Sequence, residues 1–250
     1  MDTIPGLNLS DLQNANRILA IQPHYDDNDI ATGGTLLSLA RAGIEIIYLT
    51  VTDDLAGIIH QNLTPAEAEQ RLIDDQTQAA ALLGVQDQIR LGFPDGGRYD
   101  YFALRTALIN QIQIIQPDFI FTVDPWTPYE AHHDHLMTGK ATAEAAILYS
   151  LPAFGDHPAV IKENYALTGV VFYNSAYPNQ TFDITPVIHE KQQLLRSYQA
   201  QFTPDGLETL VMQTTALAAY VALNNPFEYG ETLKIIPPWM LHGVSLTIHL

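Results

Sequence analysis

The sequence predicts an α/β fold: a single Rossmann-like, doubly wound domain whose mostly parallel sheet carries helices on both faces. Short apolar runs rich in β-branched residues alternate with longer amphipathic segments over residues 1–150, which is the pattern of βαβ units. The 250 residues are 47% apolar and 16% charged, as in compact globular chains. A chain of this length can bury a full core, so we expect residues 1–250 to form one domain with a strand order of about 3-2-1-4-5.

Local signals predict the first strand, the first helix and the second strand. Arg17–Pro23 contains an apolar run and predicts a buried strand. A helix is predicted over Asp29–Gly43, with Asp29 near its N-cap and Gly43 at its end. Ile46–Thr52 is mostly apolar with several β-branched residues, which predicts the second strand.

A capping box marks the start of the second helix. Thr64 is a good N-cap, Pro65 suits the first helical position, and Glu67 completes the box. This helix is expected to end near Leu83-Gly84, where the glycine can close it.

The remaining elements are expected in the same alternation. A short third strand, Ile89–Leu91, is closed by the turn sequence Pro94-Asp95-Gly96-Gly97. The later strands and helices are Tyr101–Gln116 (helix), Asp118–Val123 (strand), Leu136–Tyr149 (helix), Val170–Asn174 (strand), Pro186–Gln201 (helix) and Gly206–Leu223 (helix). From Pro226 on, the chain contains prolines and is expected to be partly extended.

Two polar clusters follow the first and fourth predicted strands. His24-Tyr25-Asp26-Asp27 follows the first, and His132-His133-Asp134-His135 follows the fourth. In a doubly wound sheet these two strands are neighbours at the point where the strand order reverses, and ligands bind beyond their carboxyl ends. The two clusters are therefore expected to meet in space although about 110 residues separate them.

The residue types of the two clusters indicate a metal site. Two His and one Asp can hold a zinc ion with one coordination position open, as a catalytic site requires. The chain has no Cys, so any metal must be held by His, carboxylate or carbonyl groups. A second carboxylate beside the ligands could take a proton from an activated water.

Other interpretations remain open at this point. An Asp-Asp pair after a strand is often a helix cap, and a His-rich loop can be a solvated run or an adventitious metal binder. Two His and one carboxylate also form the iron site of some oxygenases. Gly33-Gly34 suggests a phosphate-binding turn, but the full dinucleotide fingerprint is missing.

The clusters also match the motifs of a known family. The chain resembles the PIG-L/LmbE-like zinc-dependent N-deacetylases, which remove acetyl from N-acetylglucosaminyl groups. Their first motif, His-Pro-Asp-Asp-Glu followed by Gly-Gly-Thr-Leu, corresponds to His24–Asn28 and Gly33–Leu36 here. Their second motif, His-Pro-Asp-His, corresponds to His132–His135, and weaker similarity extends the resemblance over residues 17–234.

The resemblance implies a role for each clustered residue. It implies three ligands for one Zn²⁺ per chain: His24, Asp27 and His135. It implies Asp26 as the general base, His132 as the acid or oxyanion donor, and Asp134 as the residue that orients His132. Tyr25 and His133 replace the usual prolines, which predicts looser loops at both motifs.

Four further residues are candidate substrate contacts. Asp53, with Asp54, follows the second strand and can line the pocket, although a turn explains it equally well. Arg71 stands where the family places an arginine near the sugar, or is a surface residue paired with Asp74. Asp95 lies in a turn at a strand end, and Tyr129 precedes the second motif, where an aromatic ring can stack on a sugar.

Charge and composition limit the partners. The formal net charge of −17 disfavours a nucleic-acid surface and docking on anionic lipid. Residues 1–16 lack the features of a leader, no segment reaches the roughly 18 apolar residues of a membrane span, and the absence of Cys suits a cytoplasmic protein. We therefore expect a zinc-dependent deacetylase of a small amidated sugar, with an inactive metal- or sugar-binding module as the alternative and a homo-oligomer left open.

Overall fold

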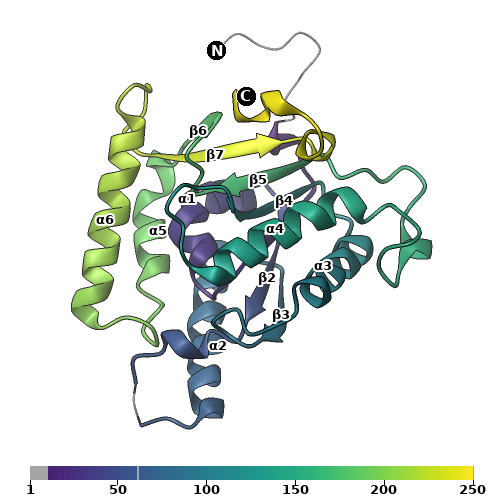
Figure 1. Ribbon diagram of the computed structural model, residues 1–250. Coiled ribbons are helices and arrows are strands. Elements are labelled where there is room, and N and C mark those ends of the chain that lie inside the picture. Colours follow the sequence, from purple (N-terminus) through teal and green to yellow (C-terminus); the bar gives the residue numbers. More distant parts are fainter. Residues whose placement is uncertain (1–10, 61, 250) are drawn as a thin grey trace.

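The computed structural model describes residues 11–60 and 62–249 and forms one seven-stranded sheet flanked by helices (Figure 1). The strands are β1 (Arg17–Gln22), β2 (Glu45–Thr52), β3 (Asp87–Phe93), β4 (Phe119–Val123), β5 (Gly169–Tyr173), β6 (Gln180–Asp183) and β7 (Gly230–Ile236). The α-helices are α1 (Asp27–Arg41), α2 (Pro65–Leu83), α3 (Tyr101–Ile115), α4 (His133–Leu148), α5 (Ile188–Leu195) and α6 (Pro204–Ala222). The prediction that residues 1–16 contain no leader falls mostly outside the described residues, since these begin at residue 11.

The strand order is β3-β2-β1-β4-β5-β7-β6, which confirms the predicted order and extends it by two strands. The first five strands pair in parallel, and β7 is antiparallel to both β5 and β6. The partly extended tail expected after Pro226 thus contains a full sheet strand. Because β1 and β4 are paired neighbours, the two sequence clusters leave the sheet side by side.

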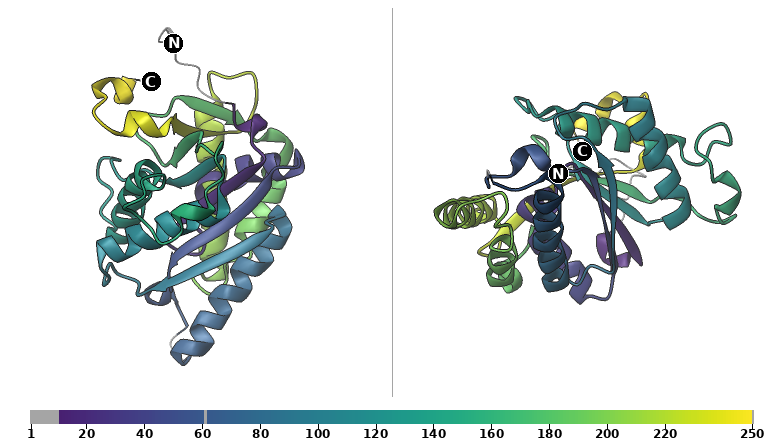
Figure 2. Two further views of the ribbon diagram at one scale, coloured as in Figure 1. Left: turned by 90° about the vertical axis from the view of Figure 1, so that its right-hand side faces the viewer. Right: turned by 90° about the horizontal axis from the view of Figure 1, so that it is seen from below.

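Helices cover both faces of the sheet, as the sequence predicts. One hydrophobic core joins the sheet to α1, α2, α5 and α6, and the other joins it to α3 and α4. Figure 2 shows the two helical layers on opposite sides of the strands. Among the described residues, no helix is both long and apolar enough to cross a bilayer.

Two helices begin earlier than predicted, and this places the clustered residues on their first turns. Helix α1 begins at Asp27 and α4 begins at His133. The predicted cap at Asp29 is wrong: its buried carboxylate lies inside α1 and accepts hydrogen bonds from the hydroxyls of Tyr48 and Tyr198. Burial raises the pKa of Asp29 to about 6 despite these two donors.

The other helix signals agree more closely with the structure. Thr64 and Glu67 form the expected capping box at the start of α2, and Gly84 closes that helix with a φ of 92°. The first predicted late helix is shorter than expected, since α5 ends at Leu195. In the segment after α5, Gln201 donates a hydrogen bond to Asp54, which follows β2, and so contributes to the site described below.

The Gly33-Gly34-Thr35 sequence is a helix-packing element and not a phosphate-binding turn. It lies within α1, where the Glu231 carboxylate accepts hydrogen bonds from the N–H groups of Gly34 (3.0 Å) and Thr35 (2.7 Å). The Thr35 hydroxyl donates to the same carboxylate at 2.6 Å. Lys191 completes this buried group with an ion pair to Glu231 at 2.6 Å.

Replacing Gly34 by Ala is expected to destabilise the fold. A Cβ at this position would stand 2.8 Å from the Ile184 side chain, and Ile184 is fully buried. Overpacking of this kind costs about 1–3 kcal/mol. Urea denaturation of the variant measures the loss. Gly33→Ala is a matched control, because the nearest atom to its Cβ is 3.8 Å away. Equal stability of the two variants would contradict the expectation.

Candidate metal centre

The centre of the site is a carboxylate that lies between two imidazoles. Asp27, the first residue of α1, places one oxygen 3.2 Å from Nδ1 of His24 and the other 3.3 Å from Nε2 of His135. His24 belongs to the loop after β1, and His135 lies in the first turn of α4. The topology therefore brings together the three residues that the resemblance implies as metal ligands.

A third imidazole completes the cluster. The ring of His132 lies with its centroid 4.6 Å from that of His24 and 5.0 Å from that of His135. One ring nitrogen from each of these three residues lies within a common 4.8 Å. His132 is exposed and is the N-cap residue of α4. Its position suits either a ligand or a donor to a bound substrate.

The turn after β3 supports the cluster from a second direction. Gly96 and Gly97 donate their N–H groups to the buried Asp134 carboxylate at 2.8 and 2.6 Å. The same turn places Asp95 3.5 Å from Nε2 of His24, and Asp134 lies at the same distance from that nitrogen. Asp134 is therefore fixed by backbone donors and by His24, and its contact with Nδ1 of His132, at 3.8 Å, is looser than the orienting role implies.

The charges of the cluster depend on one another. Burial opposes a charge on His24, but hydrogen bonds to three carboxylates outweigh it and raise its pKa well above the ordinary imidazole value. Burial also opposes a charge on Asp27, yet hydrogen bonds from His135 and His24 hold the pKa of Asp27 far below its usual range. For His132, burial and the two neighbouring imidazoles lower the pKa. The three carboxylates around His24 therefore favour the charged form of its ring.

Metal binding is expected to release protons, and the metal affinity is expected to fall as the pH is lowered. A ligand imidazole must be neutral, whereas the raised pKa of His24 favours its protonated ring. As the pH is lowered, protons compete more strongly with the metal for the ligand groups. Calorimetry of zinc binding at pH 7 in two buffers of different ionisation enthalpy should give about one released proton or more. Identical heats in both buffers would contradict this expectation.

A cavity of about 310 Å³ opens beside the cluster. Its lining includes His24, Asp26, Asp54, His132 and Gln201. Asp26 is 6% exposed and makes no side-chain cap to α1, so its carboxylate is not used to start the helix. Burial and the charges of Asp27 and Asp54 raise the pKa of Asp26. A raised pKa makes the carboxylate a better proton acceptor, as a general base requires.

Of the two aspartates after β2, Asp54 lines the cavity. It is 2% exposed and accepts hydrogen bonds from the N–H of Tyr25 (3.1 Å) and the amide of Gln201 (2.9 Å). Burial raises the pKa of Asp54 to about 7. Asp53 instead accepts the N–H of Asp95 at 3.0 Å and so shapes the neighbouring turn. The sequence alone does not distinguish these two adjacent aspartates, because their roles depend on the path of the backbone after β2.

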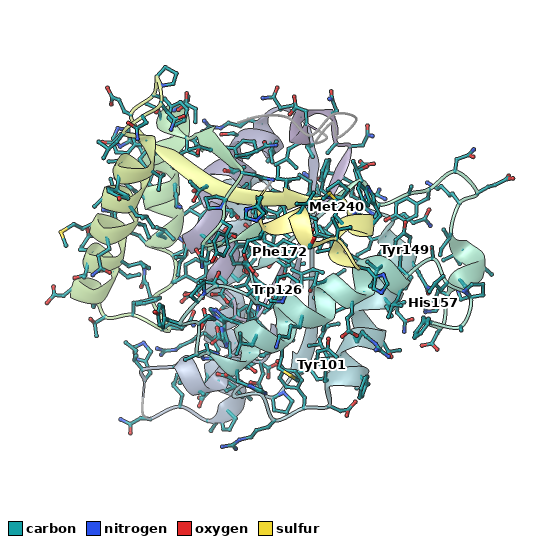
Figure 3. The ribbon with its side chains drawn as sticks, turned by 45° about the horizontal axis from the view of Figure 1, so that its top comes forward. Tyr101, Trp126, Tyr149, His157, Phe172 and Met240 are labelled. Carbon is teal, nitrogen blue, oxygen red and sulfur yellow. The ribbon has the colours of Figure 1, made fainter. Side chains whose placement is uncertain are left out.

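Among the other candidates, Asp95 lines this cavity, whereas Arg71 and Tyr129 do not. Arg71 is exposed on α2 and lines a separate cavity of about 880 Å³. Tyr129 is fully exposed with a φ of 71°. Trp126 packs edge-on against Phe172, with 5.6 Å between ring centroids, and Figure 3 shows the two side by side near Met240. Contacts of Arg71, Asp53, Asp95 and Tyr129 with substrate stay predictions.

The donor set fits a divalent transition metal. Imidazole and carboxylate are the ligands that zinc accepts in catalytic sites without Cys. Three imidazoles and Asp27 face one another within hydrogen-bonding or near-contact distance, and all are positioned by helix starts or strand ends.

Comparison with known proteins identifies the family. The model of the PIG-L family, described as GlcNAc-PI de-N-acetylase, matches residues 19–146, just over half of the chain. The chain belongs to the PIG-L family. The match includes both sequence motifs and the turn that holds Asp134.

Relatives of this PIG-L member are similar along most of its length. Diacetylchitobiose deacetylase of Thermococcus kodakarensis is 29% identical over 227 residues, covering 90% of this chain and 85% of the relative. The "Probable N-acetyl-alpha-D-glucosaminyl L-malate deacetylase 2" of Bacillus anthracis is 25% identical, covering 88% and 91%. The solved structure of N,N'-diacetylchitobiose deacetylase from Pyrococcus horikoshii superposes with a TM-score of 0.87 at 28% identity, covering 97% and 92%.

One departure from the PIG-L motif has a different effect from the predicted one. Tyr25 was expected to loosen the first motif by replacing a proline, and this prediction is wrong. Its ring is 1% exposed, packs with Leu72 and Ala200, and lies 5.7 Å below the Arg90 guanidinium. Its N–H, which a proline would lack, donates to Asp54. Tyr25 therefore anchors the loop that carries His24 and Asp26.

Proposed function

We propose that this chain is a metal-dependent N-deacetylase that removes an acetyl group from an N-acetylglucosaminyl-type sugar or conjugate. The observation that carries the proposal is the His24–Asp27–His135 cluster, whose His24 lines the same cavity as the buried carboxylate of Asp26. Membership of the PIG-L family and relatives named as deacetylases of acetylated glucosamine compounds support the reaction. The cavity, about 310 Å³, is at the lower end of the range for ligand pockets, which suits a single sugar ring.

The metal is proposed to be one Zn²⁺ held by His24, Asp27 and His135. When bound, it would act as a Lewis acid on a water molecule and on the carbonyl of the amide. His132 remains the alternative ligand, because its ring nitrogen shares the cluster with His24 and His135.

The residues of the chain supply the proton transfers. Asp26 accepts a proton as the water oxygen forms its bond to the amide carbonyl carbon. His132, at the exposed rim, donates a hydrogen bond to the carbonyl oxygen as negative charge develops there. The C–N bond then breaks, and the proton held by Asp26 passes to the departing nitrogen. Acetate and the free amine of the sugar are the products.

An inactive metal- or sugar-binding module of the same fold is the second candidate. It would use the same cluster without turning over an amide. The presence of Asp26 favours the enzyme, since a binding module does not need a buried carboxylate in the cavity beside its metal ligands. A two-His-one-carboxylate iron enzyme would instead contain iron and consume oxygen.

Metal content and amine release together test the proposal. Purified, untagged chain is analysed by mass spectrometry for metals and is assayed with diacetylchitobiose and N-acetylglucosamine. Wild type is expected to hold about one zinc per chain and to release amine, and His135→Ala to lose both. His189→Ala, which changes an exposed imidazole on α5, is the matched control and should behave as wild type. Zinc without amine release from any N-acetylglucosaminide would favour the binding module.

A further inference from the structure

A carboxylate outside the metal-ligand motifs contacts two of their residues. Glu130 lies in the loop between β4 and α4, with its side chain 21% exposed. One of its oxygens is 3.1 Å from Nδ1 of His135, and the other accepts the N–H of His132 at 2.7 Å. The same carboxylate therefore joins a ring nitrogen in the first turn of α4 to the backbone at the start of that helix.

The contact with His135 selects one form of its ring. An ionised carboxylate can only accept hydrogen bonds, so Nδ1 of His135 must carry the hydrogen. Nε2 donates its hydrogen to Asp27, and a cation that binds there takes the place of this hydrogen, which leaves the free electron pair of the neutral ring on Nε2. Nε2 is the nitrogen that lies 3.3 Å from Asp27, on the side of the cluster. The hydrogen bond thus prepares the correct nitrogen to bind a cation and fixes the plane of the ring.

The contact with His132 fixes the position of the same loop. His132 is the N-cap residue of α4, and its own side chain makes no capping hydrogen bond. Its N–H is held instead by Glu130. A carboxylate that holds both the ring and the helix start leaves His135 little freedom to rotate away from Asp27.

We propose that Glu130 is a positioning residue of the metal centre, which holds His135 with Nε2 directed at the metal. The inference rests on the metal site proposed above. Partners that receive the second N–H of a ligand imidazole typically change metal affinity by about 10–100-fold when they are removed. Glu130 does not touch the cavity beside Asp26, so its effect is expected on metal binding before any effect on substrate binding.

Zinc affinity of Glu130 variants tests the proposal. The dissociation constant is measured by competition with a fluorescent zinc chelator for wild type, Glu130→Ala and Glu130→Gln. Ala removes both acceptors. Gln keeps the size of the side chain but offers one oxygen to two donors, so one hydrogen bond is lost. Both variants are expected to bind zinc about 10–100-fold more weakly than wild type. Glu163→Gln, which removes an exposed charge elsewhere, is the control and should bind as wild type.

A spectroscopic measurement separates positioning from a general loss of structure. In ¹⁵N-histidine-labelled, zinc-loaded wild type, His135 is expected to show a protonated Nδ1. In Glu130→Gln this signal should shift or broaden while the circular dichroism spectrum stays unchanged. Wild-type affinity in both variants, with an unchanged His135 signal, would overturn the inference and leave the metal site intact. A wild-type chain that binds no zinc would overturn both.

Discussion

Replacing Asp26 by Asn is expected to lower kcat about 10²–10⁴-fold, the usual contribution of general base catalysis. Asn has nearly the same shape but cannot accept a proton from water. The zinc content should not change, because Asp26 is not among the proposed ligands and its neighbours keep their contacts. Initial rates of amine release, measured beside the zinc content of the same sample, check both parts of the expectation.

The control for this variant must remove a carboxylate without touching the site. Asp87→Asn does so, because Asp87 is exposed at the start of β3, at the opposite end of that strand from the cavity. If Asp26→Asn keeps activity within about tenfold of wild type, Asp26 is not the base. Asp54→Asn then becomes the next variant to test, since Asp54 is another buried carboxylate that lines the cavity.

Replacing Glu231 by Gln is expected to lower the free energy of unfolding by about 3–5 kcal/mol, the cost of breaking a buried ion pair by removing one partner. Lys191, 4% exposed, would keep its charge without the carboxylate that lies 2.6 Å away. Because the amide keeps only one oxygen, either the Gly34 N–H or the two Thr35 donors would also lose their acceptor. Urea denaturation followed by circular dichroism measures the change.

A surface ion pair provides the comparison. Arg41 and Glu190 are 2.9 Å apart, but both are exposed, so Glu190→Gln should change stability little. Equal effects of the Glu231 and Glu190 variants would show that the buried pair contributes no more than a surface one. A Glu231→Gln chain that is unstable yet regains zinc binding at low temperature would place its effect in the fold and not in the metal site.

The strand order was predictable because the apolar runs that form the central strands are visible in the sequence. Apolar runs at Arg17–Gln22 and Phe119–Val123 and the rule for doubly wound sheets suffice to make β1 and β4 neighbours. β6 was not predicted, because Gln180–Asp183 is short and only partly buried. β7 lies between Pro226 and Pro237, and prolines on both sides are typical of an irregular segment, so the sequence did not predict a strand there.

The site was predictable only where residues are close in sequence. His24 with Asp27, and His132 with His135, stand together in motifs, and the fold rule joins the two. Glu130 carries no such mark, since a lone acid in a loop is usually solvated and its contact with His135 depends on how the loop folds back. That Arg71 lines a different cavity likewise depends on how α2 packs against the rest of the fold, which the local sequence pattern does not reveal.

The Glu231 carboxylate also bears on when the centre can form. It holds the middle of α1 across 197 residues of chain from Gly34, while Asp27 stands at the beginning of the same helix. Synthesis proceeds from the N-terminus, and contacts of such long sequence separation must wait for the distant partner and for the entropy of a large loop. The first metal-ligand motif is therefore made early but gains its last packing partner only when β7 has left the ribosome. We therefore expect the proposed metal centre to reach its final packing only after β7 has joined the sheet.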